Sequence, residues 1–187
     1  FNFQDVIFKS KFGTSNQTAM SGIPSESRSP TSVGVTVTNA DGTESGGLTG
    51  SVNRQISNTD VDAVIVTLTW PQIQVAEDDG DIRGDRVSYK IQVRHDSGSY
   101  VTKIDTFVDG RTADAYARDH RIELTSGFTT VDVRVIRNTI DSSDSARVNS
   151  FQFTSLQEVI DDNSTYPNSA YVGLRLDSKQ FNRIPSR

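Results

Sequence analysis

Alternation of apolar and polar residues is the feature that most constrains how this chain can fold. In segments 64–70, 87–94 and 131–135, valine, isoleucine, leucine, tyrosine or tryptophan occupies every second position. A period of two turns one face of an extended strand toward a core and the other toward water. Because no window of useful length shows the period of an amphipathic helix, we predict an all-β fold.

The spacing of turn-forming residues indicates the kind of β fold. Asp96-Ser97-Gly98 and Asp109-Gly110 each separate two segments of extended character. Such signals recur about every 8–12 residues, which is typical of a β-sandwich. We therefore predict a sandwich of the fibronectin type III or immunoglobulin-like kind over residues 58–162. An additional β-rich N-terminal segment with a loop is expected at residues 1–57, and a C-terminal strand segment at 163–187.

Composition and charge exclude several classes of function. The 187 residues include 24 acidic and 19 basic side chains, a net charge of −5, whereas a nucleic-acid-binding protein normally carries a basic field. Cysteine is absent, which excludes disulfides, thiolate catalysis and cysteine-ligated metals. No apolar run approaches the roughly 20 residues of a membrane-spanning helix, so no membrane span is predicted. The chain begins at Phe1, and we interpret it as a piece or a processed product of a longer protein.

The two histidines give little reason to expect catalysis. His95 follows a strand-like segment and His120 lies within Arg118-Asp119-His120-Arg121. Neither belongs to a metal-binding spacing, and no G-x-S-x-G nucleophile motif is present. A Ser–His–Asp set assembled in space stays open, but we expect both histidines to lie on the surface.

The densest acidic run is a candidate calcium loop. Glu77, Asp78, Asp79 and Asp81 surround Gly80, and Ca²⁺ prefers six to eight oxygen ligands. The run lacks the full EF-hand pattern, and a solvated loop between two strands explains it better than a calcium site does. We expect the solvated loop, and we predict neither a metal nor a cofactor. A hydrolase that uses these carboxylates is a further hypothesis.

The neighbouring Arg83-Gly84-Asp85 tripeptide resembles an integrin-binding sequence, but it is short enough to occur by chance.

The last third of the chain carries a longer pattern. Its residues are Tyr166, Pro167, Asn168, Ala170, Gly173, Asp177, Gln180 and Phe181. They resemble Y-P-N-T-A-x-V-G-L-x-x-D-A-x-Q-F in the host-specificity protein J family, the tail tip attachment proteins of lambda-like phages. Segments 54–58, 61–71 and 108–112 resemble further stretches of that family in the same order. Gly13 and Gln17 fit its R-x-G-T-x-x-Q stretch.

The resemblance implies an internal fragment of a phage or prophage tail tip or central hub. In that family a homotrimer closes the distal end of the tail tube, and fibronectin type III insertions decorate the hub. The chain would then be a structural, non-enzymatic virion component, synthesised in the bacterial host cytoplasm, that acts in tail assembly and host attachment. Its partners would be other copies of the tip protein, neighbouring tail proteins and a host-surface receptor. No catalytic residue or cofactor is implied.

The family pattern is interpreted as structural. Tyr166 and Pro167 are expected to set a turn, and Gly173 to permit a close backbone approach. The paired apolar ends of the chain suggest that it leaves and returns to a larger hub domain.

A binding module is the alternative to a structural role. A β-sandwich of this kind could hold a host-surface glycan or an outer-membrane protein, and exposed aromatic residues on one face would favour it. Tyr100 and Tyr116 are the candidates, although we expect both to pack within the domain.

Overall fold

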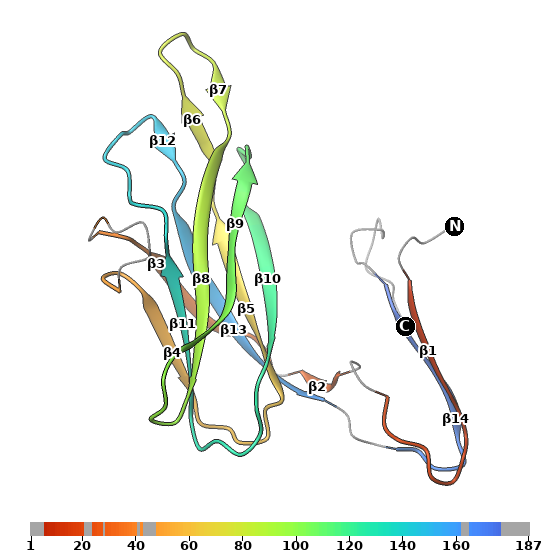
Figure 1. Ribbon diagram of the computed structural model, residues 1–187. Helices are drawn as coiled ribbons and strands as arrows, with labels where there is room; N and C mark the ends of the chain where they lie inside the picture. The colour runs from red at the N-terminus through yellow and green to blue at the C-terminus, as the bar shows by residue number, and fades with distance from the viewer. Residues whose placement is uncertain are drawn as a thin grey trace. The chain divides into compact units, whose positions relative to one another are not determined.

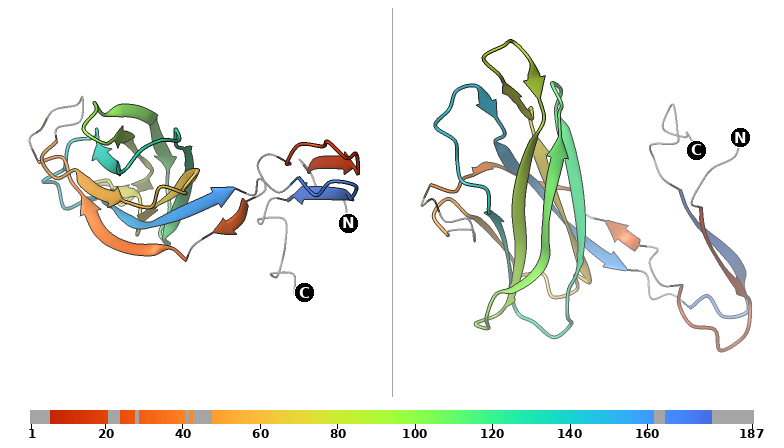
Figure 2. Two further views of the ribbon diagram at one scale, coloured as in Figure 1. Left: turned by 90° about the horizontal axis from the view of Figure 1, so that it is seen from below. Right: turned by 45° about the horizontal axis from the view of Figure 1, so that its top comes forward.

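The larger part of the chain is one β-sandwich (Figures 1 and 2). The computed structural model describes residues 6–20, 24–27, 29–40, 42, 48–161 and 165–176. These residues form fourteen strands and no helix, which confirms the all-β prediction. The chain divides into a compact unit of residues 27–159 and a second unit made from the residues on either side of it. The larger unit includes strands that lie at 31–37 and 52–56, within the predicted N-terminal segment 1–57.

One sheet of the sandwich has four antiparallel strands. Its order is β4 (Val52–Ile56), β11 (Val131–Arg137), β8 (Asp85–His95) and β9 (Val101–Gly110). Strand β8 alternates without a fault: Val87, Tyr89 and Ile91 are completely buried, whereas the intervening side chains are partly exposed. The period of two in the sequence therefore corresponds to one core face and one outer face.

The second sheet lies face to face with the first. Its order is β10 (Tyr116–Glu123), β5 (Ala63–Trp70), β13 (Phe151–Asp161) and β2 (Pro24–Ser27), and β3 (Thr31–Val37) also pairs with β13. Between the sheets, the completely buried ring of Trp70 lies 5.1 Å from that of Phe151 and 5.4 Å from that of Tyr89, centre to centre. Aromatic rings at such distances pack favourably, so this cluster forms the centre of the core.

A small three-stranded sheet extends beyond one end of the sandwich (Figure 1). Its order is β12 (Arg147–Val148), β6 (Gln74–Ala76) and β7 (Ile82–Arg83). The acidic run lies in the connection between β6 and β7. This sheet brings the 77–81 and 138–150 connections to the same end of the sandwich.

The second unit contains a two-stranded antiparallel ribbon. Strand β1 (Ile7–Phe12) pairs along its length with β14 (Ala170–Arg175), from Ile7 opposite Arg175 to Phe12 opposite Ala170. The segment that precedes the sandwich in the sequence and the segment that follows it are therefore joined by main-chain hydrogen bonds. The residues that the structure describes contain no helix with the length and apolarity needed to cross a bilayer.

The expectation that both histidines lie on the surface is wrong for His120. This side chain is only 9% exposed, and its Nε2 lies 2.8 Å from the hydroxyl oxygen of Tyr89 in the core. Burial lowers the pKa of His120, and the positive charge of Arg118 acts in the same direction. Burial also raises the pKa of Tyr89 to about 12, so the phenol stays protonated.

The lowered pKa of His120 predicts a loss of stability in mild acid. The unfolded chain takes up this proton near about pH 6.5, whereas the folded chain resists it until a lower pH. The free energy of unfolding therefore falls as the pH drops below about 6.5, by up to about 1.4 kcal/mol per pH unit until the folded pKa is reached. Urea unfolding, followed by fluorescence of the single tryptophan Trp70, measures this loss.

The variant His120→Gln serves as the control, because glutamine keeps a polar group near Tyr89 and does not titrate. Its stability should decline less than that of the natural chain between about pH 7.5 and about pH 5.5. Parallel declines in the two proteins would contradict the assignment to His120.

Candidate functional site

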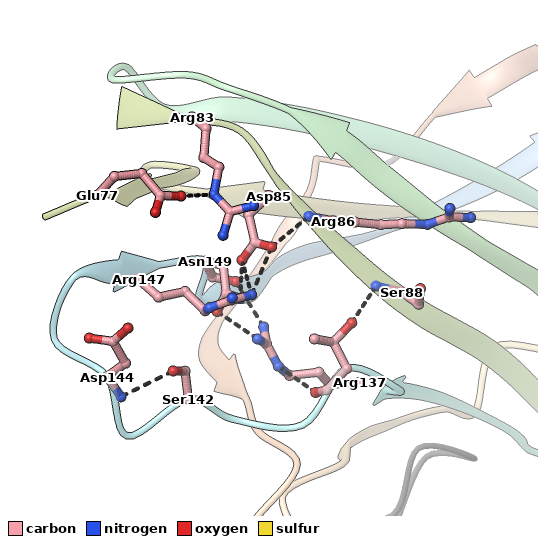
Figure 3. A network of polar contacts seen from close by, with 11 residues as sticks. Glu77, Arg83, Asp85, Arg86, Ser88, Arg137, Ser142, Asp144, Arg147 and Asn149 are labelled. Carbon is pink, nitrogen blue, oxygen red and sulfur yellow. Dashed lines mark hydrogen bonds and ion pairs between the residues drawn. The ribbon is translucent and has the colours of Figure 1, made fainter. Parts of the chain in front are cut away.

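A buried arginine organises the end of the sandwich that carries the small sheet (Figure 3). Arg137, the last residue of β11, is 1% exposed. Its Nε donates to the carbonyl oxygen of Thr139 at 2.9 Å and lies 3.0 Å from Oδ1 of Asp141. Its two terminal nitrogens donate to the carbonyl oxygen and to Oδ1 of Asn149, at 2.8 and 2.7 Å. The planar guanidinium thus joins β11 to the connection that precedes β13.

A carboxylate at the start of β8 extends this network. Asp85 accepts hydrogen bonds from Nη1 of Arg147, at 2.9 Å to Oδ1 and 3.1 Å to Oδ2, and from Nδ2 of Asn149 at 2.7 Å (Figure 3). Burial lowers the pKa of Arg137, while the charges of Asp141 and Asp85 oppose that shift. The network therefore surrounds a buried cation with hydrogen-bond acceptors and nearby negative charge.

A cavity of about 270 Å³ adjoins the network. Its lining includes Arg137, Asp141 and Asn149 together with the hydroxyl-bearing residues Ser142 and Ser150. Arg137 and Asn149 are hydrogen-bonded to each other, and Asp141 forms an ion pair with Arg137. No histidine is among the described residues that line the cavity, so its serines have no histidine base beside them. These contacts are suited to holding the segments of Asp141 and Asn149 against the end of β11.

The Arg83-Gly84-Asp85 tripeptide is part of the same framework. Arg83 forms an ion pair with Glu77, and the Asp85 side chain is only 11% exposed. A Cβ atom on Gly84 would lie 2.7 Å from the carbonyl carbon and oxygen of Gly110, closer than real Cβ atoms approach. The structure thus uses Gly84 for a close backbone approach and Asp85 for the network.

The acidic run forms a tight turn. The amide of Glu77 donates to the carbonyl oxygen of Asp81 at 2.8 Å, and Oδ1 of Asp79 accepts from the amide of Asp81 at 3.0 Å. Asp78, Asp79 and Asp81 are exposed, and Glu77 is engaged with Arg83. Within the described ranges, no group of three or more His, Cys, Asp or Glu side chains is placed to hold a metal ion.

The family pattern of the last third lies in the second unit, at the turn that precedes β14. The amide of Ser169 donates to the carbonyl oxygen of Tyr166 at 3.1 Å, and Tyr166 and Asn168 adopt positive φ values of 43° and 60°. Pro167 lies within this turn. Gly173 is buried in β14 opposite Lys9, and Ala170 begins the strand. Asp177, Gln180 and Phe181 lie outside the described residues.

Gln17 holds this turn against the N-terminal strand. Its side-chain amide donates to the carbonyl oxygens of Tyr166 and Ser169, at 2.5 and 2.9 Å, and its Oε1 accepts from the amide of Gly13 at 3.0 Å. A Cβ atom on Gly13 would lie 3.1 Å from the amide nitrogen of Ala170. The Gly13–Gln17 spacing and the Tyr166–Ala170 block are therefore two halves of one contact, a relation that neither pattern reveals alone.

Both candidate aromatic residues contact other side chains of the sandwich. The Tyr100 ring lies beneath the guanidinium groups of Arg134 and Arg94, whose central carbons are 3.6 and 4.7 Å from its centroid. The centre of the Tyr116 ring lies 6.0 Å from that of Trp70. Each ring therefore contributes to packing within the domain.

Comparison with known proteins identifies the family of this fold. The sequence model of the family described as "Tip attachment protein J, FNIII-A domain" matches residues 27–162. Two curated relatives are the tip attachment proteins J of Escherichia phages SECphi4 and SECphi27, which are 40% and 33% identical to this chain over 134 and 132 residues. These matches cover 71% and 70% of this chain, but only 12% and 11% of the relatives.

The two packed sheets and the family match define a fibronectin type III domain of a phage tail tip protein. The chain belongs to the family of the FNIII-A domain of tip attachment protein J. The predicted fold class and the predicted family are therefore both confirmed.

The network predicts a large loss of stability from a substitution that keeps its charge. Arg137→Lys should lower the free energy of unfolding by about 2 kcal/mol or more, because an ammonium group cannot reach all the acceptors that the guanidinium serves. Urea unfolding followed by Trp70 fluorescence measures the effect.

The matched control is Arg121→Lys, since the Arg121 side chain is 29% exposed and its partner Glu123 is 69% exposed. Its cost should stay below about 1 kcal/mol. An equal cost for the two variants would show that the network does not stabilise the domain.

The geometry of the acidic turn predicts no response to calcium. A ligand that binds only the folded state raises the thermal unfolding midpoint. Because the carboxylates of the turn are not placed to hold a metal ion, millimolar Ca²⁺ should leave this midpoint unchanged. A saturable rise that disappears in an Asp78→Asn/Asp79→Asn/Asp81→Asn variant would instead establish a calcium site.

Proposed function

We propose that this chain is a structural, non-enzymatic part of a phage or prophage tail tip, acting in tail assembly and host attachment within the virion. The family membership and the names of the two relatives support this proposal. The relatives are much longer than the matched segment, so this domain would serve as one module of a larger tip protein.

The pairing of β1 with β14 is the observation that carries the structural role. The chain passes from β1 through the whole sandwich and comes back to pair with β1 at β14. This path is what an inserted domain has, because its two connections to the host domain must lie side by side. We therefore propose that residues 27–159 form a module inserted into a neighbouring domain of the tip protein.

The chemistry of the described residues is consistent with a scaffold. The buried Arg137 and Asn149 are hydrogen-bonded to each other, and Asp85 forms an ion pair with Arg147. These groups fix loops in place, as a structural module requires. The partners that we propose are other copies of the tip protein, arranged as a homotrimer, and the neighbouring tail proteins. A host-surface receptor would be engaged by the intact tip.

The location of the domain in the virion tests this proposal. Gold-labelled antibodies raised against the 187-residue chain should bind the tail tip of the phage that encodes it. Prior incubation of the antibodies with purified chain should abolish this labelling. Peptides of the chain should also be found by mass spectrometry in purified particles. Their absence from particles, or labelling at the head, would overturn the proposal.

A competition experiment distinguishes the scaffold from a binding module. An excess of purified chain should leave the rate of phage adsorption to its host unchanged, because a scaffold domain has no receptor of its own. A saturable slowing of adsorption that is lost in Tyr100→Ala would instead support a module that grips a host glycan or an outer-membrane protein.

A further inference from the structure

The β1–β14 ribbon has one apolar face that is open to water. Residues directly opposite each other in an antiparallel pair lie on the same face, and the register places Phe8 opposite Leu174 and Phe12 opposite Ala170. Val172 lies opposite Ser10 on this face. The exposed fractions are 62% for Phe8, 87% for Phe12, 56% for Val172 and 60% for Leu174.

The other face of the ribbon has a different character. It carries Lys9, Lys11 and Arg175, together with Ile7, Tyr171 and Gly173. The ribbon is therefore amphipathic, as a strand pair with one face on a core is. Large aromatic and aliphatic side chains gathered on one exposed face mark a surface that another element covers.

The ribbon needs a covering layer, since a two-stranded ribbon is at best marginally stable in water without a further strand or a packed layer. Both strands lie outside residues 27–162, the segment matched by the FNIII-A family. The curated relatives continue far beyond the matched segment, which is only 12% and 11% of their length. A polypeptide of that size has ample sequence for a neighbouring β domain.

We infer that the face formed by Phe8, Phe12, Val172 and Leu174 packs against an apolar sheet of the same tip protein polypeptide. Strands β1 and β14 then belong to that neighbouring domain. The opposite face, on which Gly173 is buried and the Tyr171 ring contacts that of Tyr166, stays packed within this chain. This inference rests on the proposed function, in which residues 27–159 are a module inserted into a neighbouring domain of a longer tip protein.

Cysteine labelling at two adjacent positions tests the inference, because this chain has no cysteine of its own. Ser10→Cys places a nearly isosteric thiol on the apolar face. Lys11→Cys places one on the opposite face of the same strand, and both positions are partly exposed. The reaction with a polar maleimide is followed by mass spectrometry of the peptide that contains the new cysteine. It is measured both in the 187-residue chain and in the full-length tip protein.

The expected result is a selective protection. Ser10→Cys should react at least about tenfold more slowly in the full-length protein than in the 187-residue chain, and Lys11→Cys should change by less than about threefold. Equal rates for Ser10→Cys in both proteins would overturn the inference. Slow labelling of Ser10→Cys in the 187-residue chain itself would also overturn it. If the slow labelling does not depend on protein concentration, the sandwich of the same chain covers the face. If it does depend on protein concentration, a second copy of the chain covers the face.

Hydrogen exchange on the unsubstituted proteins gives a second readout that needs no variant. Amides of β1 and β14 should exchange at least about tenfold more slowly in the full-length protein than in the 187-residue chain, and unchanged rates would overturn the inference. The outcome is separable from the proposed function. Tail tip labelling of virions does not depend on which surface covers the ribbon, and protection of Ser10→Cys does not depend on where the protein is found.

Discussion

The packing of Trp70 against Tyr89 and Phe151 is the contact on which the rest of the sandwich depends. Trp70 belongs to one sheet and Tyr89 to the other, so their contact joins the two layers. Aromatic side chains bury more apolar area than any others, and the surrounding valines complete the core. With the layers fixed in this way, the polar residues at the end of the sandwich are brought within hydrogen-bond distance of one another.

The buried polar groups give the domain a defined arrangement at that end. Removing a guanidinium from water is costly, and the attraction to Asp141 and the acceptors of Thr139 and Asn149 offsets that cost only in one geometry. Asp85, at the start of β8, holds Arg147 and Asn149 in the same way. Segments far apart in the sequence therefore share one set of polar contacts.

The period of two made the strands at 64–70, 87–94 and 131–135 predictable, because only an extended chain satisfies it. Arg137 shares the parity of the buried valines of β11, and His120 shares that of the buried Ile122. We expected His120 at the surface because polar residue types are mostly exposed. Whether a polar side chain can be buried depends on partners that only the folded chain supplies. The contact between Gln17 and the turn at Tyr166 was likewise hidden, because it joins the two ends of the sequence.

The antiparallel pairing of β1 with β14 also has a mechanical consequence. Tension that pulls the chain apart at Ile7 and Arg175 acts first on the hydrogen bonds between these two strands, one after another toward Phe12 and Ala170. Until that ribbon has been peeled open, the sandwich carries none of the load. Pulling on these two points would thus open a short ribbon first, while the larger core stays folded.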